Sequence, residues 1–481
     1  MKKTSKVKGV LEVLAVIGLI LVIPLFFAIK TAADKQEAKN TPMPLTPTAM
    51  ATFESNAVTT AKQPPQCTFP LAQTTTVESM PEEYTFSEPQ VVLTAPANLD
   101  IVGWLPDNQR VLITRDIPTK DQQSIELFNP QTGETQVYAI RRATPLQASP
   151  LWIASLNAVL YPETFPLSLS YDNNGMLQYP INMKRLLWLS RGNPANAQSI
   201  EDSQVTVYID RRPTVGSNFT VIAKPDGSQI IYSDGVSKQL YQRKTLLGVL
   251  GTVQSLSFDL TQWDYRRPNN ALQPVSFKMT WRPGATQVFL YSGPDSGNYT
   301  FLSDVASGQI CELNLFGKED PNNWQKSWAM RANWSQNGRY LAVVRTKGKG
   351  PFDFSDLIIL DTTSGELHQI DAKKLSPTNI NVQGKYFIND VAWAPDNRHL
   401  AVIGQVDYYP PGSDSFQVIN RLYLVDFIAD QATQISSQEL ESNVGETNLL
   451  WSENSTQLLV KCPTHQEGRL CLVYVQKNVQ H

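Results

Sequence analysis

Apolar and polar residues alternate in short runs along most of the chain, and the clearest example lies at residues 391–403. Val391 and Trp393 fall on one face of a first strand, a Pro-Asp-Asn turn follows, and Leu400 begins an apolar run. Because strands of this length alternate their side chains between two faces, the segment predicts a β-hairpin with one buried face.

The same pattern returns six more times along the chain. In these repeats the first strand ends at Trp104, Trp152, Ala223, Trp281, Trp334 and Trp451. With Trp393, neighbouring positions lie 48 to 71 residues apart. A repeat of roughly 40–50 residues with four short strands is typical of β-propeller blades, and longer loops would stretch it. We therefore expect an all-β, seven-bladed propeller, or six blades if the weak third repeat is not one.

The turn between the third and fourth strands of several repeats carries a glycine, as at Gly133, Gly308 and Gly365, which supplies a positive φ. The last repeat has three strands and lacks a fourth. The isolated apolar run at residues 89–95 predicts the missing strand, placed beside residues 470–475. Pairing the two ends in this way closes the ring and removes exposed sheet edges.

These motifs carry a resemblance to a known class of repeat. Trp-x-Pro-Asp-(Gly/Asn), an apolar strand and Asp-x-x-(Ser/Thr)-Gly-(Glu/Gln) are similar to the WD-like repeat of TolB-type and tricorn-type β-propellers, over about residues 89–479. The second repeat departs from the pattern because it lacks the Pro-Asp turn, and the third has Ala223 instead of the aromatic residue. The resemblance implies a platform that binds proteins or small ligands.

The chain before the repeats has a different character. Residues 1–9 are basic, residues 10–30 are almost wholly apolar, and residues 31–82 are rich in Thr, Pro and Ala. The apolar run is long enough to cross a bilayer as a helix, and the lysines before it favour a cytoplasmic N-terminus. We therefore expect a single-pass signal-anchor helix, a flexible linker and an extracytoplasmic propeller at residues 83–481. A cleaved signal peptide is the alternative.

Charge and cysteine content narrow the possible partners. The chain has 41 basic and 44 acidic residues, a net charge of -3, which disfavours nucleic acid as a partner. Its four cysteines lack the paired spacing of a metal site, and we expect no metal or cofactor. Cys462 and Cys471 fall on neighbouring strands of one hairpin. They form a disulfide if the domain lies outside the cytoplasm, or they are two unlinked core residues.

Residues that recur in the repeats have structural interpretations. Asp107, Asp226 and Asp396 occupy the first turn of their repeats, where an Asp side chain accepts backbone N–H groups. The repeated tryptophans are expected to form the contacts between blades. The four histidines are scattered, and the sequence contains no known catalytic motif. We therefore expect a binding protein and not an enzyme.

Long loops should gather on one face of the ring, because second turns and links between blades lie opposite the short first and third turns. These loops are rich in aromatic residues and arginine, as protein interfaces are. We predict that this face binds a protein, a peptide or an envelope glycan, unless the side chains only pack against their own loops. The predicted binding residues are Trp263, Tyr265, Arg266, Arg267, Phe352, Phe354, Tyr408, Tyr409 and Phe416.

An enzyme is the alternative function. A propeller lyase, lactonase or glycosidase would need a metal or paired carboxylates near the axis. The candidates for that role are Asp264, Asp353, Asp356, Asp407 and Asp414. Two of them, or one of them and a histidine, within about 6 Å of each other near the axis would favour this alternative.

Overall fold

The computed structural model divides into two compact units, residues 1–60 and 61–481, and the residues it describes all belong to the second unit. The described residues are 65–71, 83–95, 98–118, 120–143, 148–167, 181–207, 220–233, 240–246, 249–252, 254–256, 277–292, 300–316, 326–348, 354–375, 384–410, 412–413, 415, 417–440, 447–454, 456–462 and 468–478.

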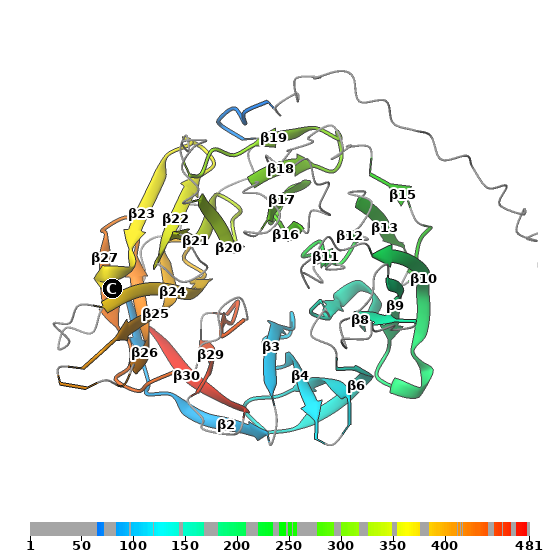
Figure 1. Ribbon diagram of the computed structural model, residues 1–481, viewed down its shortest axis with the longest axis horizontal. Helices are drawn as coiled ribbons and strands as arrows, with labels where there is room; N and C mark the ends of the chain where they lie inside the picture. Colours follow the sequence, from blue (N-terminus) through cyan, green and yellow to red (C-terminus); the bar gives the residue numbers. More distant parts are fainter. Residues whose placement is uncertain are drawn as a thin grey trace, which may run out of the picture. The chain divides into compact units, whose positions relative to one another are not determined.

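The second unit consists of seven antiparallel sheets that follow one another along the chain, as Figure 1 shows. In five of the sheets, successive strands pair as a four-stranded meander, and in the other two an additional strand is paired. Blade 1 contains β3 (Leu99–Trp104), β4 (Val111–Ile117), β5 (Gln122–Phe128) and β6 (Thr135–Arg142). Blade 2 contains β7 (Leu151–Ile153), β8 (Ala158–Pro166), β9 (Ile181–Ser190) and β10 (Gln198–Val207), with short 3-10 turns at Ala154–Leu156 and Pro194–Asn196. Blade 3 contains β11 (Thr220–Ala223), β12 (Gln229–Ser233), β13 (Leu240–Leu246), β14 (Val249–Leu250) and β15 (Gln254–Ser255).

Blades 4 to 6 repeat the four-stranded meander. Blade 4 contains β16 (Phe277–Trp281), β17 (Gln287–Ser292), β18 (Thr300–Asp304) and β19 (Ile310–Glu312). Blade 5 contains β20 (Lys326–Trp334), β21 (Tyr340–Gly348), β22 (Phe354–Asp361) and β23 (Leu367–Asp371), followed by a 3-10 turn at Ala372–Leu375. Blade 6 contains β24 (Gly384–Trp393), β25 (His399–Tyr408), β26 (Gln417–Asp426) and β27 (Gln431–Gln434).

Blade 7 joins the two ends of the propeller. Its strands β28 (Leu449–Trp451), β29 (Gln457–Lys461) and β30 (Gly468–Asn478) are completed by β1 (Glu83–Phe86) and β2 (Gln90–Ala95), which both pair with β30. Val91 lies opposite Cys471, so the predicted closure is confirmed. The sequence predicted one closing strand, whereas β1 and β2 share the task along the long β30.

The first strand of each blade faces the centre of the ring. Contacts run from β3 to β7, β11, β16, β20, β24 and β28, and from β28 back to β3. Figure 1 shows the blades arranged around this centre. This circuit confirms the prediction of seven blades, the third repeat included.

Seven apolar clusters fill the contacts between neighbouring blades, one at each contact. Trp281, Trp334, Trp393 and Trp451 are buried members of four of them, each packed against the preceding blade. Ala223 packs at the margin of the cluster between blades 2 and 3, where a tryptophan would otherwise stand. The predicted role of the repeated tryptophans as contacts between blades is confirmed.

The recurring turn acids bind the backbone of their own turns. Asp107 accepts hydrogen bonds from the N–H groups of Gln109 and Arg110, and Asp226 accepts one from the N–H of Ser228. Asp396 does the same for the two residues that follow Asn397. Their predicted role as turn residues is therefore confirmed.

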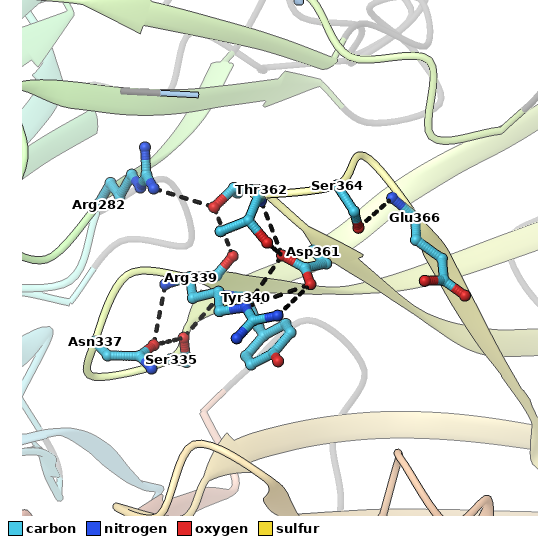
Figure 2. A network of polar contacts seen from close by, with 10 residues as sticks. Arg282, Ser335, Asn337, Arg339, Tyr340, Asp361, Thr362, Ser364 and Glu366 are labelled. Atoms are coloured by element: carbon cyan, nitrogen blue, oxygen red, sulfur yellow. Dashed lines mark hydrogen bonds and ion pairs between the residues drawn. The ribbon is translucent and has the colours of Figure 1, made fainter. Parts of the chain in front are cut away.

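Neighbouring blades are also joined through their turns, as Figure 2 shows for blades 4 and 5. The fully buried Arg282 donates from Nε to the carbonyl of Gly338 at 2.7 Å and from Nη2 to the hydroxyl of Thr362 at 3.0 Å. The Thr362 hydroxyl in turn donates to the carbonyl of Arg339, whose guanidinium pairs with Asp361 at 2.8 Å. One guanidinium thus links the first turn of blade 4 to two turns of blade 5.

A short segment of the predicted linker lies against the propeller. Cys67 forms a disulfide with Cys311, and its backbone N–H donates to the carbonyl of Glu312 at the end of β19. The N–H of Leu71 donates to the carbonyl of Thr362 in blade 5. Residues 65–71 are therefore fixed to blades 4 and 5, an attachment that the linker prediction did not include.

The second pair of cysteines, Cys462 and Cys471, also forms a disulfide, between the end of blade 7's second strand and β30. The disulfide is the alternative that the structure contains. Within the described ranges, no helix is long and apolar enough to cross a membrane. The predicted anchor at residues 10–30 lies outside those ranges.

Candidate functional site

A row of polar residues lies on, or directly before, the innermost strands of four consecutive blades. Lys278, Arg331, Asp390 and Asn448 each stand three residues before the tryptophan of their blade. The neighbouring positions in these strands are mostly apolar, and a charged group in such surroundings is costly unless it is paired. We call these four residues the central row.

β-Bulges change the direction of two side chains of the central row, Arg331 and Asp390. The pairing of β20 with β21 shifts between Ala329 and Arg331, and the pairing of β24 with β25 shifts between Ile388 and Asp390. An extra residue at the same place in two blades redirects the side chain that follows it. The bulges therefore bring Arg331 and Asp390 into contact across two blades.

Asp390 is the buried acid of the row, with a fully covered side chain. Its Oδ1 atom lies 2.6 Å from Nε of Arg331 and accepts from its neighbour Val391, and Oδ2 accepts from the N–H groups of Asn448 and Leu449. Burial raises the pKa of Asp390, whereas Arg331 and the three N–H groups act against that shift. The carboxylate therefore holds blades 5, 6 and 7 together.

Arg331 and Lys278 are the two cations of the row. Arg331 Nη2 donates to the hydroxyl of Thr447 at 3.0 Å, and Lys278 Nζ donates to the carbonyl of Met330 at 3.1 Å. Lys278 is exposed, yet desolvation by the surrounding strands lowers its pKa, and the positive charge of Arg331 lowers it further. Burial raises the pKa of Tyr291, the cross-strand neighbour of Lys278, to about 12, so this phenol stays neutral.

The row is reached from one particular face. Lys278 is the second residue of β16, and the short first turn of blade 4 lies at the other end of this strand. It therefore lies toward the face that carries the second turns and the links between blades. This is the face on which the sequence predicted binding.

Of the predicted binding residues, the structure describes the side chains of two. The hydroxyl of Tyr408, at the end of β25, donates to Gln417 Oε1 at 2.9 Å, and Tyr409 is 61% exposed at the same second turn of blade 6. Phe354 begins β22. Trp263, Tyr265, Arg266, Arg267, Phe352 and Phe416 lie outside the described residues. The predicted set of binding residues stays a prediction.

Two of the acids proposed for an enzyme have local partners. Asp356 forms an ion pair with Arg345 and also accepts from Gln369, while Asp407 accepts from Gln405. Burial raises the pKa of Asp407. Asp264, Asp353 and Asp414 lie outside the described residues. In the part of the chain that the structure describes, no group of three or more His, Cys, Asp or Glu side chains could hold a metal ion.

The sequence contains a sign of the central row outside the repeated turn motifs. Aligned on the tryptophan position, the residues three places earlier are Ile101, Ser149, Thr220, Lys278, Arg331, Asp390 and Asn448. Three of these residues are charged, whereas the same position in the first three blades is apolar or small, and this difference could have identified the row. It could not have identified the partner of each side chain.

The fold is a seven-bladed β-propeller. Similar solved structures include the β-propeller domain of Cps50 (Swd1) from Myceliophteria thermophila, with 10% identity, a TM-score of 0.42, and coverage of 80% of this chain and 99% of that one. An oligogalacturonate lyase in complex with manganese has 11% identity, a TM-score of 0.41 and coverage of 83% and 97%. TolB from Acinetobacter baumannii has 9% identity, a TM-score of 0.33 and coverage of 76% and 79%. No family profile matches the sequence, and no curated protein matches it either.

Proposed function

We propose that this protein is a membrane-anchored binding platform that holds its propeller outside the cytoplasm. The observation that carries the binding role is the central row, because stability alone does not call for charges on the innermost strands. Apolar residues of similar volume are often as stabilising as a buried ion pair, or more so. Ligand-binding sites typically orient their ligand through a few polar groups among mostly apolar residues.

The compartment is inferred from the cysteines and the N-terminal sequence. All four cysteines of the chain are joined in two disulfides, Cys67–Cys311 and Cys462–Cys471. Disulfides persist in oxidising compartments and are rare in the cytosol. The basic residues 1–9 and the apolar residues 10–30 favour the same orientation, with the propeller outside.

Thiol counting in whole cells tests the compartment. Cells that express the full chain are quenched in acid, and the protein is treated with a maleimide-coupled polymer before and after reduction. We expect no polymer to attach before reduction and four polymer molecules to attach to each chain after reduction, since the chain has four cysteines. Free thiols before reduction would contradict an extracytoplasmic propeller.

Cross-linking in intact cells tests the binding face. The full chain is compared with the double variant Tyr408→Ala/Tyr409→Ala and with Tyr474→Ala, whose tyrosine is 41% exposed on β30. We expect the double variant to lose its cross-linked partner at least tenfold and Tyr474→Ala to retain it. Equal yields from all three proteins would remove the second turn of blade 6 from the binding face.

A further inference from the structure

Lys278 differs from the rest of the central row in its pairing. Asp390 is bound by Arg331 and by three backbone N–H groups, which leaves that carboxylate little capacity for another cation. The one hydrogen bond of the Lys278 ammonium goes to the carbonyl of Met330, and within the described residues no carboxylate pairs with it. An ammonium has three donors, so two remain for a ligand.

The row also has an uneven charge. Lys278 and Arg331 contribute two positive charges and Asp390 one negative charge, which leaves one positive charge in excess. Lys278 is exposed, so a solute can reach the ammonium, and the strands around it partly desolvate the charge. A single negative charge placed here would be attracted more strongly than at an open surface, because less water screens the interaction.

We propose that Lys278, with Arg331 behind it, binds the carboxylate group of a ligand at the centre of the ring. This inference rests on the proposed function, since it names the chemistry that the binding face recognises. A carboxylate carries one negative charge and balances the row, whereas a doubly charged phosphate would leave an unpaired negative charge among the strands. The ammonium contacts the carboxylate, and Arg331 is a positioning residue held by Asp390.

NMR of the lysine side chains tests this site directly in the full chain, purified in mild detergent. Selective ¹³C labelling of lysine gives each residue its own Cε signal and leaves the ammonium unmodified, and Lys278→Gln identifies the signal of Lys278. We expect sodium acetate to shift this signal saturably, whereas sodium chloride at equal ionic strength does not. Lys373, an exposed lysine near the end of blade 5, serves as the control and should respond to both salts alike.

Two further measurements separate binding from a general salt effect. The pH at which the Lys278 signal titrates should rise by at least half a unit in acetate, because a bound anion favours the charged amine. Arg331→Lys, which keeps the charge of the row, should weaken acetate binding at least threefold. Unchanged signals of the other lysines show that the variant is folded. A linear acetate response at Lys278 equal to that at Lys373 would overturn the proposal.

Matched pairs of small molecules identify the source of the carboxylate. Galacturonate is compared with galactose, and N-acetylglutamate with N-acetylglutamine. The site is supported if one acid binds saturably and more tightly than its neutral partner. Preference for galacturonate assigns the site to a uronic acid, and preference for N-acetylglutamate assigns it to an acidic side chain. If Lys278→Gln retains its cross-linked partner and no acid binds saturably, the carboxylate site is wrong while the binding platform stands.

Discussion

The ion pair between Arg331 and Asp390 shows, at the scale of single residues, how much stability depends on keeping both partners. Asp390 is fully covered, and its attraction to Arg331 offsets the cost of removing two charges from water. Removing one partner leaves the other charge buried without compensation. Removing both at once avoids that penalty.

We therefore predict that Asp390→Ala lowers the free energy of unfolding by about 3–5 kcal/mol. The double variant Arg331→Met/Asp390→Leu should recover at least half of this loss. Denaturant unfolding of the purified chain, followed by tryptophan fluorescence, measures both values. Asp107→Ala is the control, because Asp107 lies in an exposed turn and its loss should cost about 1 kcal/mol. A loss below that of the control would contradict the role of Asp390.

A second acid gives a prediction about pH. Burial alone would raise the pKa of Asp361, but hydrogen bonds from Arg339 and Thr363 outweigh it and hold the pKa below its usual range. A carboxyl whose pKa is lower in the folded state stabilises the protein above its unfolded pKa of about 3.9. That stability is lost as the pH falls through the folded value.

Asp361→Asn should therefore cost about 1–2 kcal/mol at pH 7, and the cost should shrink as the pH falls and the carboxylate of the parent protein becomes protonated. The measurement is the difference in melting temperature between variant and parent from pH 7 downward. Asp371→Asn, at an exposed position in the same blade, should show a small difference at every pH. A constant difference for Asp361→Asn would mean that its carboxylate charge contributes nothing.

At the scale of strands and turns, first turns of neighbouring blades touch closely. Gly338 has φ 68°, and a Cβ atom there would lie 2.5 Å from the carbonyl oxygen of Pro283 in blade 4. Gly133 has φ 76°, but its Cβ would meet nothing within 4 Å. These two glycines share the backbone conformation and differ in the contact with a neighbouring blade.

We predict that Gly133→Ala costs about 1 kcal/mol, the price of a left-handed backbone for a residue with a Cβ. Gly338→Ala should cost at least about 1 kcal/mol more, because the turn of blade 4 must move. Thermal unfolding of the two variants provides the comparison. Equal costs would show that the turns of blades 4 and 5 separate freely.

The strands and turns were predictable because their determinants are local. The Pro-Asp-Asn turn at Asp396, the apolar run from Leu400 and the glycine at Gly365 each act within a few residues, so the hairpins can be read from spacing alone. The closing strand was predictable because a three-stranded last blade leaves an edge that must pair.

The contacts between distant parts were not predictable. Cys67 and Cys311 are separated by 244 residues, and the spacing of cysteines does not show which ring position meets the N-terminal segment. The pairing of Arg331 with Asp390 likewise depends on two bulges and on the packing of adjacent blades. These contacts depend on how the blades pack together in the ring, which the sequence of a single repeat does not determine.

At the scale of the whole molecule, the two disulfides should differ in strength. Cys67–Cys311 closes a loop of 244 residues, and Cys462–Cys471 closes one of nine. If the entropy of the unfolded chain dominates, they contribute about 5 and about 3 kcal/mol respectively. We therefore predict that Cys67→Ser/Cys311→Ser lowers the melting temperature more than Cys462→Ser/Cys471→Ser, as scanning calorimetry can measure. The reverse order would show that the N-terminal attachment adds little to the ring.

The attachment at Cys67 also determines where mechanical tension enters the molecule. A pull on the N-terminal side of the chain passes through the Cys67–Cys311 bond into β19, in the middle of the sequence of blades. The strands β1 and β2, which join the ends of the propeller, follow Cys67 in the chain, so the pull is not applied to them directly. A protein held at its N-terminal end could thus bear a force on its ligand without opening the seam on which its closed shape depends.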